Sequence, residues 1–318
     1  MHYFVTGCSG FIGSNLVDRL LENGHYVTGY DNFSTGLEQF LIMANKSPRF
    51  TLVRGDLLDL GLLTSSMINA EVVLHMAANA DVRFGTMHPY KDLEQNTLAT
   101  YNVLEAMRAN DIRRIAFAST GSIYGESAII PTPENAPFPI QTSLYGSSKL
   151  AAEGLIQAYC EGFGFQANIF RFVSILGERY THGHVIDFYK QLLINPNKLT
   201  VLGDGRQKKS YLYIHDCIDA MLYVMGHIDD KINIFNLGTD EYCQVNNSIH
   251  WICHYLNIEP IVEYTGGERG WIGDNPFIFL DCSKIRALGW KPKLSIQEGI
   301  VKTIEFLSNN HAILDCRP

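Results

Sequence analysis

A glycine-rich turn lies near the start of the chain, between a short apolar segment and an amphipathic one. Three glycines, Gly7, Gly10 and Gly13, repeat at intervals of three residues in the run Thr-Gly-Cys-Ser-Gly-Phe-Ile-Gly. Residues 3–6 have the pattern of a buried strand, and residues 11–22 that of a helix with one apolar face. Glycine lets the backbone approach a pyrophosphate closely, and a helix N-terminus offers free N–H groups and a favourable dipole. In this context the spacing predicts a dinucleotide-binding turn.

Short apolar strands alternate with helices through the first half of the chain. Further strands are expected at 26–30, 50–53, 72–75, 115–119 and 167–172, and helices at about 93–109 and from residue 145. This alternation predicts a parallel sheet covered by helices on both faces. Ligands of such sheets bind beyond the carboxyl ends of the strands, where the motifs described below fall.

The regularity weakens after residue 172. A strand at 211–214, a helix at 216–226 and a strand at 234–237 are expected to return to the main sheet, and helices near 245–256 and 295–307 to form a smaller C-terminal lobe. The predicted organisation is a dinucleotide-binding domain over 1–175, with returning segments at about 211–238, and a mainly substrate-binding lobe over 176–318. The predicted fold class is therefore α/β, a doubly wound parallel sheet with a smaller lobe.

Composition narrows the class of protein. The formal charge is −8 and no basic stripe balances it, which argues against a nucleic-acid partner. The seven cysteines show no C-x-x-C spacing, so neither a disulfide framework nor a metal site is expected. The first residues run directly into a strand, which is typical of neither a signal peptide nor a membrane span. We therefore expect a cytoplasmic protein with no membrane partner.

Polar and small residues follow several of the strands. Asp31 ends the second strand, where an acidic residue can bond the adenosine ribose, and its charge favours NAD over NADP. The alternative is that Asp31 and Asn32 only form a turn. Asp56 follows the third strand, where a carboxylate could reach the adenine amine. Ala77 and Ala78 follow the fourth, where small residues either let the chain pass close to the cofactor or simply pack.

Tyr145 is the one tyrosine of the chain with a lysine, Lys149, four positions later. The helical pattern that follows places the phenol and the ammonium one turn apart on one face. A neighbouring cation favours the phenolate and would make the phenol a usable base, although an ordinary surface pair is the alternative. Ser119 and Thr120 end a strand between the glycine turn and this pair. Together these features indicate a nicotinamide enzyme that acts on a hydroxyl.

The motifs occur in the order typical of the extended short-chain dehydrogenases/reductases. They are Thr6-Gly7-x-x-Gly10-Phe11-Ile12-Gly13, Asp31-Asn32, Asp56-Leu57, Ala77-Ala78, Asn96, Ser119-Thr120-Gly121-Ser122-Ile123-Tyr124-Gly125 and Tyr145-x-x-x-Lys149. Within that superfamily the chain resembles the nucleotide-sugar 4-epimerases of the UDP-glucose (UDP-galactose) 4-epimerase type. The resemblance spans nearly the whole chain and implies a Rossmann-type fold with bound NAD.

The resemblance also implies the reaction. Tyr145 would take the proton from the C4 hydroxyl of the sugar, directly or through Thr120, while hydride leaves C4 for NAD. Lys149 would bond the nicotinamide ribose and keep the phenol acidic. The 4-keto sugar would then swing about its diphosphate and accept the hydride on the opposite face.

Further contacts follow from the resemblance in the same way. Phe11 and Ile12 would face the pyrophosphate, and Asn96 would support the site from the long helix. The full set of expected cofactor contacts is Gly7, Gly10, Phe11, Ile12, Gly13, Asp31, Asn32, Asp56, Leu57, Ala77, Ala78, Asn96, Ser119, Tyr145, Lys149 and Phe172. The expected substrate contacts are Thr120, Ser122, Tyr145, Ser174, Lys209 and Arg269.

Two of these substrate contacts are cations that would hold the diphosphate. Lys209 stands where the family commonly has an arginine, so it supplies the charge without a bidentate fork, and Arg269 would be a second clamp. The alternative is that both lie in solvated loops. Arg179, His182 and His184, in the loop 177–187, could meet the sugar or the base, or could simply be polar loop residues.

The exact substrate stays open. Related dehydratases carry an Asp-Glu pair after the threonine, and this chain has Gly121 and Ser122 there, which disfavours a 4,6-dehydratase. Ser174 replaces an asparagine common in the family, which could shift selectivity toward a uronic acid. The alternatives are a UDP-glucuronate or UDP-N-acetylhexosamine 4-epimerase, a uronate decarboxylase, or a non-catalytic dinucleotide-binding protein. The resemblance also implies a homodimer, formed through the helices at 93–109 and 145–163.

Overall fold

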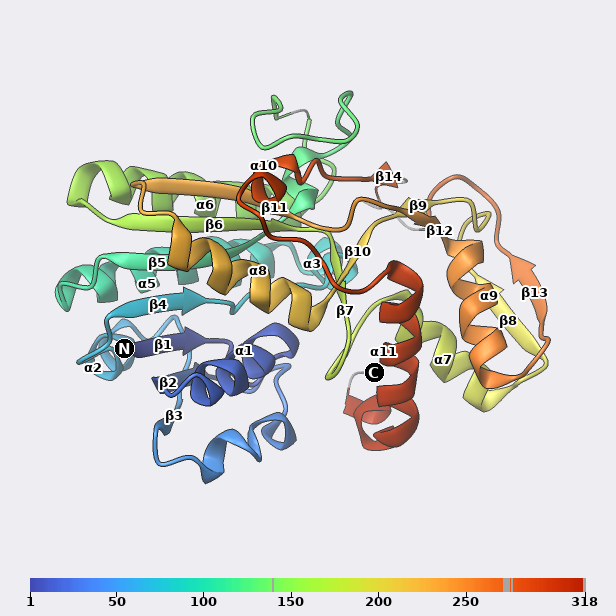
Figure 1. Cartoon of the computed structure of the whole chain (residues 1–318), viewed down its shortest axis with the longest axis horizontal. Coiled ribbons are helices and arrows are strands. Elements are labelled where there is room, and N and C mark those ends of the chain that lie inside the picture. The colour runs from blue at the N-terminus through green and yellow to red at the C-terminus, as the bar shows by residue number, and fades with distance from the viewer. Residues whose placement is uncertain (139, 271–274, 276, 317–318) are drawn as a thin grey trace.

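The computed structural model describes residues 1–138, 140–270, 275 and 277–316 (Figure 1). A seven-stranded sheet has the order β11-β6-β5-β4-β1-β2-β3, and every pairing in it is parallel. Its strands are β1 (His2–Thr6), β2 (Tyr26–Asp31), β3 (Phe50–Arg54), β4 (Val72–His75), β5 (Arg114–Thr120), β6 (Gln166–Phe172) and β11 (Ile232–Leu237). The predicted α/β class with a Rossmann-type sheet is confirmed.

Helices cover both faces of the sheet. On one face α1 (Phe11–Glu22) packs against α8 (Ile214–His227); on the other lie α2 (Leu60–Ser66), α5 (Ala99–Ala109) and α6 (Leu144–Phe163). Within β1, Tyr3 and Val5 belong to the core under α1, while Phe4 belongs to the core under α5 and α6. Because successive side chains of a strand point to opposite faces, one apolar run serves both cores.

The long helix expected at 93–109 is formed, but its first part is irregular. A π-helical turn spans Leu93–Leu98 and continues directly into α5. Two short helices, α3 (Val82–Met87) and α4 (Pro89–Asp92), precede it. π-helical turns concentrate at functional sites, and Asn96 lies in this one.

The strand expected at 211–214 does not join the main sheet, and that expectation was wrong. β10 (Tyr211–Tyr213) instead pairs in parallel with β7 (Ser174–Leu176) outside it. The place beside β6 is taken by β11, which pairs with β6 along its length. Helix α8, which connects β10 to β11, and β11 itself both lie close to the ranges that the sequence predicts.

The rest of the chain forms a lobe beyond the carboxyl ends of the sheet strands, which point toward it in Figure 1. Its elements are α7 (His184–Ile194), β8 (Lys198–Val201), β9 (Lys208–Lys209), β12 (Cys243–Gln244), α9 (Val245–Leu256), β13 (Ile261–Tyr264), β14 (Phe277–Ile278) and α11 (Ile296–Asn309). The short helix α10 (Ser283–Ala287) lies beside β11 of the main sheet. Short 3-10 turns lie at Glu38–Leu41, Ala44–Lys46, Gly121–Tyr124 and His311–Cys316. Over the described ranges, no helix is long and apolar enough to cross a membrane.

Candidate active site

The glycine turn packs backbone against backbone. A Cβ added at Gly7 would lie 2.7 Å from the Ala77 nitrogen, and one added at Gly13 would lie 2.0 Å from the Gly7 oxygen. Gly10 is the N-cap of α1 and gives the helix no side-chain cap. The start of α1 is therefore held tightly against the ends of β1 and β4, and no side-chain hydrogen bond caps it. A pyrophosphate fits such a helix start.

Asp31, Asn32 and Asp56 come together at the ends of β2 and β3. The Asp31 carboxylate accepts hydrogen bonds from the backbone N–H of Ser9 at 2.9 Å and of Phe33 at 2.8 Å. Asn32 Nδ2 donates to Asp56 Oδ2 at 2.8 Å. The bond to Phe33 is the turn that the alternative interpretation expected, and the bond to Ser9 braces the glycine turn. Asp31 therefore shapes the turn whether or not it also meets a ribose.

Lys149 is buried, with 2% of its surface exposed, so the pair with Tyr145 is not an ordinary surface pair. The Lys149 Nζ lies 4.3 Å from the centre of the Phe117 ring. Tyr145 and Lys149 both belong to α6. The first turn of this helix is capped by Ser143, whose side chain accepts a hydrogen bond from Gly146 N at 3.0 Å. The helix places the phenol and the ammonium one turn apart, as the spacing predicts.

Burial dominates the electrostatics of the pair. It raises the pKa of Tyr145 to about 12, against a hydrogen bond from Thr120 that lowers it. It also lowers the pKa of Lys149 to about 7, against the Glu153 carboxylate that raises it. That Lys149 helps to keep the phenol acidic, as the resemblance implies, stays a prediction. Taking both groups out of water disfavours both charged forms.

Thr120 is brought to Tyr145 by the end of β5. Its side chain lies beside the phenol and lowers the phenol's pKa, and it accepts a hydrogen bond from Ser122 N at 3.1 Å. Ser119, one residue earlier, donates to the Glu153 carboxylate. The structure thus joins the end of β5 to α6 on both sides of Lys149.

Asn96 links three segments of the site. Its Nδ2 donates to Ser148 Oγ at 2.9 Å and to the Asn79 carbonyl at 3.2 Å, and its Oδ1 accepts from Asn79 N at 2.8 Å. The π-helical turn is thereby tied to α6 and to the loop after β4. Ala77, in the same loop, donates its N–H to Thr6 Oγ1 at 3.2 Å, and Ala78 is half-buried.

The larger apolar residues expected at the cofactor are mostly core residues. Phe11 is buried, and its ring meets that of Tyr180 edge-on with 5.7 Å between centres. Leu57 and Phe172 are buried at the ends of β3 and β6, and Ile12 is half-buried. Phe11 and Ile12 can therefore face a pyrophosphate through their backbone N–H groups rather than through their rings or methyl groups.

The other three residues expected to bind substrate lie on separate segments. Ser174 is exposed at the start of β7, beside Tyr211 of β10. Lys209 Nζ donates to the Asn275 carbonyl at 2.6 Å, and Arg269 forms an ion pair with Glu126. Both cations are therefore held by protein partners.

The loop residues Arg179 and His184 are also placed by the protein itself. Arg179 forms an ion pair with Asp18 of α1. His184 Nδ1 lies 3.2 Å from the Tyr211 hydroxyl, and burial lowers the pKa of its imidazole to about 3. His182 stacks on Tyr180 with 6.2 Å between ring centres. Nothing in these contacts requires a sugar or a base.

The sequence did not single out Glu153, Arg171 or Asp92, which are all buried. Glu153 and Arg171 form an ion pair at 2.7 Å, and the Asp92 charge adds to the rise in the pKa of Tyr145. The signal for Glu153 was its position four residues after Lys149, one more turn along the same face.

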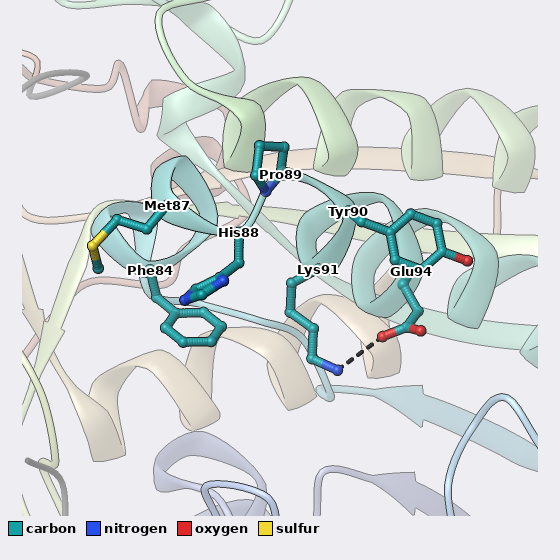
Figure 2. Close-up of a pocket in the computed structure, with 7 residues that line it drawn as sticks. All are labelled: Phe84, Met87, His88, Pro89, Tyr90, Lys91 and Glu94. Atoms are coloured by element: carbon teal, nitrogen blue, oxygen red, sulfur yellow. Dashed lines mark hydrogen bonds and ion pairs between the residues drawn. The ribbon is translucent and has the colours of Figure 1, made fainter.

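Figure 2 shows a surface pocket of α3, α4 and the π-helical turn that holds none of the expected site residues. It is lined by Phe84, Met87, His88, Pro89, Tyr90, Lys91 and Glu94. The Lys91 ammonium pairs with the Glu94 carboxylate at 2.8 Å across it. Among the residues that the structure describes, no group of three or more His, Cys, Asp or Glu could hold a metal ion.

The chain is similar to known proteins over most of its length. The model of the NAD dependent epimerase/dehydratase family matches residues 3–238. A putative UDP-glucose 4-epimerase of Methanocaldococcus jannaschii is 34% identical, over 96% of this chain and 98% of its own. A crystal structure of a UDP-galactose 4-epimerase is 34% identical with a TM-score of 0.87, covering 98% of this chain and 99% of its own. A UDP-glucuronic acid 4-epimerase from Bacillus cereus, in complex with UDP-glucuronic acid and NAD, is 26% identical with a TM-score of 0.89, covering 97% and 99%.

Proposed function

Because this chain belongs to the NAD-dependent epimerase/dehydratase family, we propose that it inverts C4 of a nucleotide-diphosphate hexose of the UDP-glucose/UDP-galactose type through a 4-keto intermediate. NAD, the cofactor expected from the sequence, is confirmed by this membership. The observation that carries the proposal is the placement of Thr120 beside Tyr145, with the buried Lys149 one helical turn away. A protein that only bound a dinucleotide would have no use for a buried ammonium next to a phenol.

The residues present fit NAD. The start of α1 and the glycine turn would hold the pyrophosphate, Asp31 the adenosine ribose and Lys149 the nicotinamide ribose. When bound, NAD accepts hydride from C4 and returns it to the opposite face of the ring. The close packing of Gly13 on the Gly7 backbone supports this assignment, because it holds the start of α1 against the turn.

Tyr145 and Thr120 would handle the proton of the C4 hydroxyl. Because the Thr120 side chain lies beside the phenol, a sugar hydroxyl bound next to them can pass its proton to the phenolate oxygen, directly or through Thr120. The Tyr145 pKa of about 12 is too high for a base near neutral pH, so it must fall in the assembled site. Positive charge supplies that change: the Lys149 ammonium and the cationic cofactor ring both favour the phenolate.

Lys209 and Arg269 would hold the diphosphate. Each now has a neutral or charged partner in the protein, the Asn275 carbonyl and the Glu126 carboxylate. A diphosphate would offer both cations shorter, charge-assisted hydrogen bonds in exchange. The substrate would therefore enter by displacing the Lys209–Asn275 and Arg269–Glu126 interactions.

A second candidate substrate is a UDP-uronate, turned over by epimerisation or by decarboxylation. Ser174 favours it, because this small exposed hydroxyl stands where many relatives have an asparagine. Ser122 and Thr120, at the end of β5, add two more hydroxyls that could meet a carboxylate. The similarity to a UDP-glucuronic acid 4-epimerase supports this candidate.

The homodimer and the cytoplasmic location stay predictions. On the proposed dimer helices, Leu98 and Tyr101 expose 40% and 43% of their surface, and Leu144, at the start of α6, exposes 43%. A second copy would cover such apolar surface.

The test is turnover on a panel of UDP-, dTDP-, GDP- and CDP-sugars, hexoses and uronates included, with products resolved by chromatography. Tyr145→Phe should abolish turnover and leave NAD bound, because it removes the proton acceptor and keeps the ring. Tyr159→Phe is the matched control: its hydroxyl lies on the same helix but bonds Glu105, away from the site. Near-normal turnover by Tyr145→Phe would reject the mechanism.

A further inference from the structure

Three side chains follow one another along one face of α6: Tyr145, Lys149 and Glu153. Their spacing is one helical turn each, so all three face the end of β5. Thr120 lies beside Tyr145, and Glu153 accepts a hydrogen bond from Ser119. Two consecutive strand residues therefore meet the helix on either side of Lys149, and the second contact is a hydrogen bond.

Glu153 is held by a second, stronger interaction. Arg171 of β6 donates to it twice, from Nη2 to Oε2 at 2.7 Å and from Nε to Oε1 at 3.1 Å. Glu153 is 0% exposed and Arg171 2% exposed. Arg171 is fixed in turn by the Tyr124 hydroxyl at 2.6 Å and the Glu134 carbonyl at 2.8 Å. A buried ion pair costs much desolvation free energy, and an apolar pair of similar volume often gives equal stability. A role beyond stability is therefore indicated.

The groups packed around Lys149 show what that role is. The Phe117 ring of β5 lies against the Lys149 ammonium. His75 of β4 also acts on this ammonium, but its imidazole is neutral, because burial lowers its pKa to about 3. Asp92, from α4, acts on Tyr145. The carboxylate that opposes the effect of burial on Lys149 is Glu153.

We propose that Glu153 is a positioning residue of the active site: its buried carboxylate ties the end of β5 to the catalytic helix and supplies the negative charge beside Lys149. Its consequence for turnover rests on the proposed function. Without that charge, Lys149 loses its proton at a lower pH and no longer favours the Tyr145 phenolate. Glu153 itself touches neither the phenol nor the ammonium through any described hydrogen bond.

The direct test is the titration of Lys149 by NMR of lysine labelled at the ε-carbon, with the signal assigned by its absence in Lys149→Arg. The wild-type midpoint is expected near 7, and Glu153→Gln should lower it by at least about one pH unit. Glu161→Gln is the matched control, because this α6 carboxylate is exposed and pairs with Lys231. An unchanged midpoint in Glu153→Gln would overturn the proposal.

Glu153→Gln leaves Arg171 buried without a counter-charge and could fail to fold. The double variant Glu153→Gln/Arg171→Met removes both charges and should fold; its midpoint should lie below that of the wild type but above that of Glu153→Gln, because the Arg171 charge no longer opposes the ammonium. Glu153→Asp, which restores the charge, should return the midpoint toward the wild-type value. A Lys149 midpoint equal to that of the wild type would overturn the proposal, whether it is found in Glu153→Gln or in the double variant.

Turnover gives a second readout. The alkaline limb of kcat against pH should move to lower pH in Glu153→Gln by the same amount as the Lys149 midpoint, whereas a loss of structure alone would lower kcat at every pH. If the wild-type protein turns over no nucleotide sugar, the proposed function fails, and the Lys149 titration still decides the role of Glu153.

Discussion

Replacing Gly13 by alanine tests how the glycine turn holds NAD. The added carbon would lie 2.0 Å from the Gly7 oxygen, 2.8 Å from the Gly7 carbonyl carbon and 3.1 Å from Cys8 Cα. Real contacts of this kind essentially never fall below 3.0 Å, so α1 must move away from the turn by about 1 Å. The obstructing atoms nearest to it are backbone atoms, which cannot turn aside as a flexible side chain could.

Good N–H···O hydrogen bonds have donor–acceptor distances of about 2.7–3.2 Å. A shift of about 1 Å is larger than the width of that range, so it would break a hydrogen bond from the helix start. Losing one bond from the helix start to a charged phosphate oxygen costs about 1.5–3 kcal/mol, which is roughly a 10- to 150-fold loss of NAD affinity. The overpacking itself should lower the free energy of unfolding by about 1–3 kcal/mol.

The assay is calorimetric titration of the NAD-free protein with NAD, together with urea unfolding. Gly226→Ala serves as the control: this glycine lies in α8, and an added Cβ would meet nothing within 4 Å. It should keep NAD affinity and gain up to about 1 kcal/mol from helix propensity. If Gly13→Ala bound NAD as tightly as the wild type, the fit of the turn to a pyrophosphate would be refuted.

Three further outcomes are expected. Asp31→Ala should weaken NAD more than NADP, because the carboxylate repels a 2′-phosphate; an unchanged preference in binding titrations would remove Asp31 from the ribose. Lys149→Met should be more stable than the wild type below pH 7, because burial lowers the pKa of Lys149 from 10.5 to about 7. The unfolded wild type binds one proton more than the folded protein between pH 7 and 10.5, so its free energy of unfolding rises with pH there. In urea unfolding, the stability difference between variant and wild type should therefore shrink from pH 7 to pH 10.5. A difference independent of pH would contradict this. Ser174→Asn should shift kcat/KM from UDP-uronates toward UDP-hexoses in competition assays, and equal ratios in both proteins would exclude Ser174 from selectivity.

The alternation of strands and helices was readable from the sequence because the physics is local. Residues 11–22 and 72–75 form a helix and a strand with the predicted bounds, since apolar periodicity and chain twist decide both. The motif residues lie at strand ends, and parallel strands end at one edge. The meeting of Gly7 with Ala77, and of Thr120 with Tyr145, follows from that one rule.

Pairings that depend on competition between distant segments were not readable. α7 lies in a stretch where the sequence predicts only mixed structure, although its buried residues follow a helical spacing. β10 has the composition of a strand, but its place in the main sheet is occupied by β11, a segment of similar composition that follows later. The choice between two similar strands is decided by the whole packed structure.

The sequence by itself determined which groups meet at the site: a glycine turn, a carboxylate at the end of β2, a hydroxyl at the end of β5 and a phenol one helical turn from an ammonium. Only the tertiary structure decided their electrostatics. Burial raises the pKa of Tyr145 and lowers that of Lys149. Glu153, two helical turns after Tyr145, is buried in an ion pair with Arg171 of β6. Residue spacing carries the geometry of a helix face, whereas the cost of a charge depends on how much water the entire fold leaves around it.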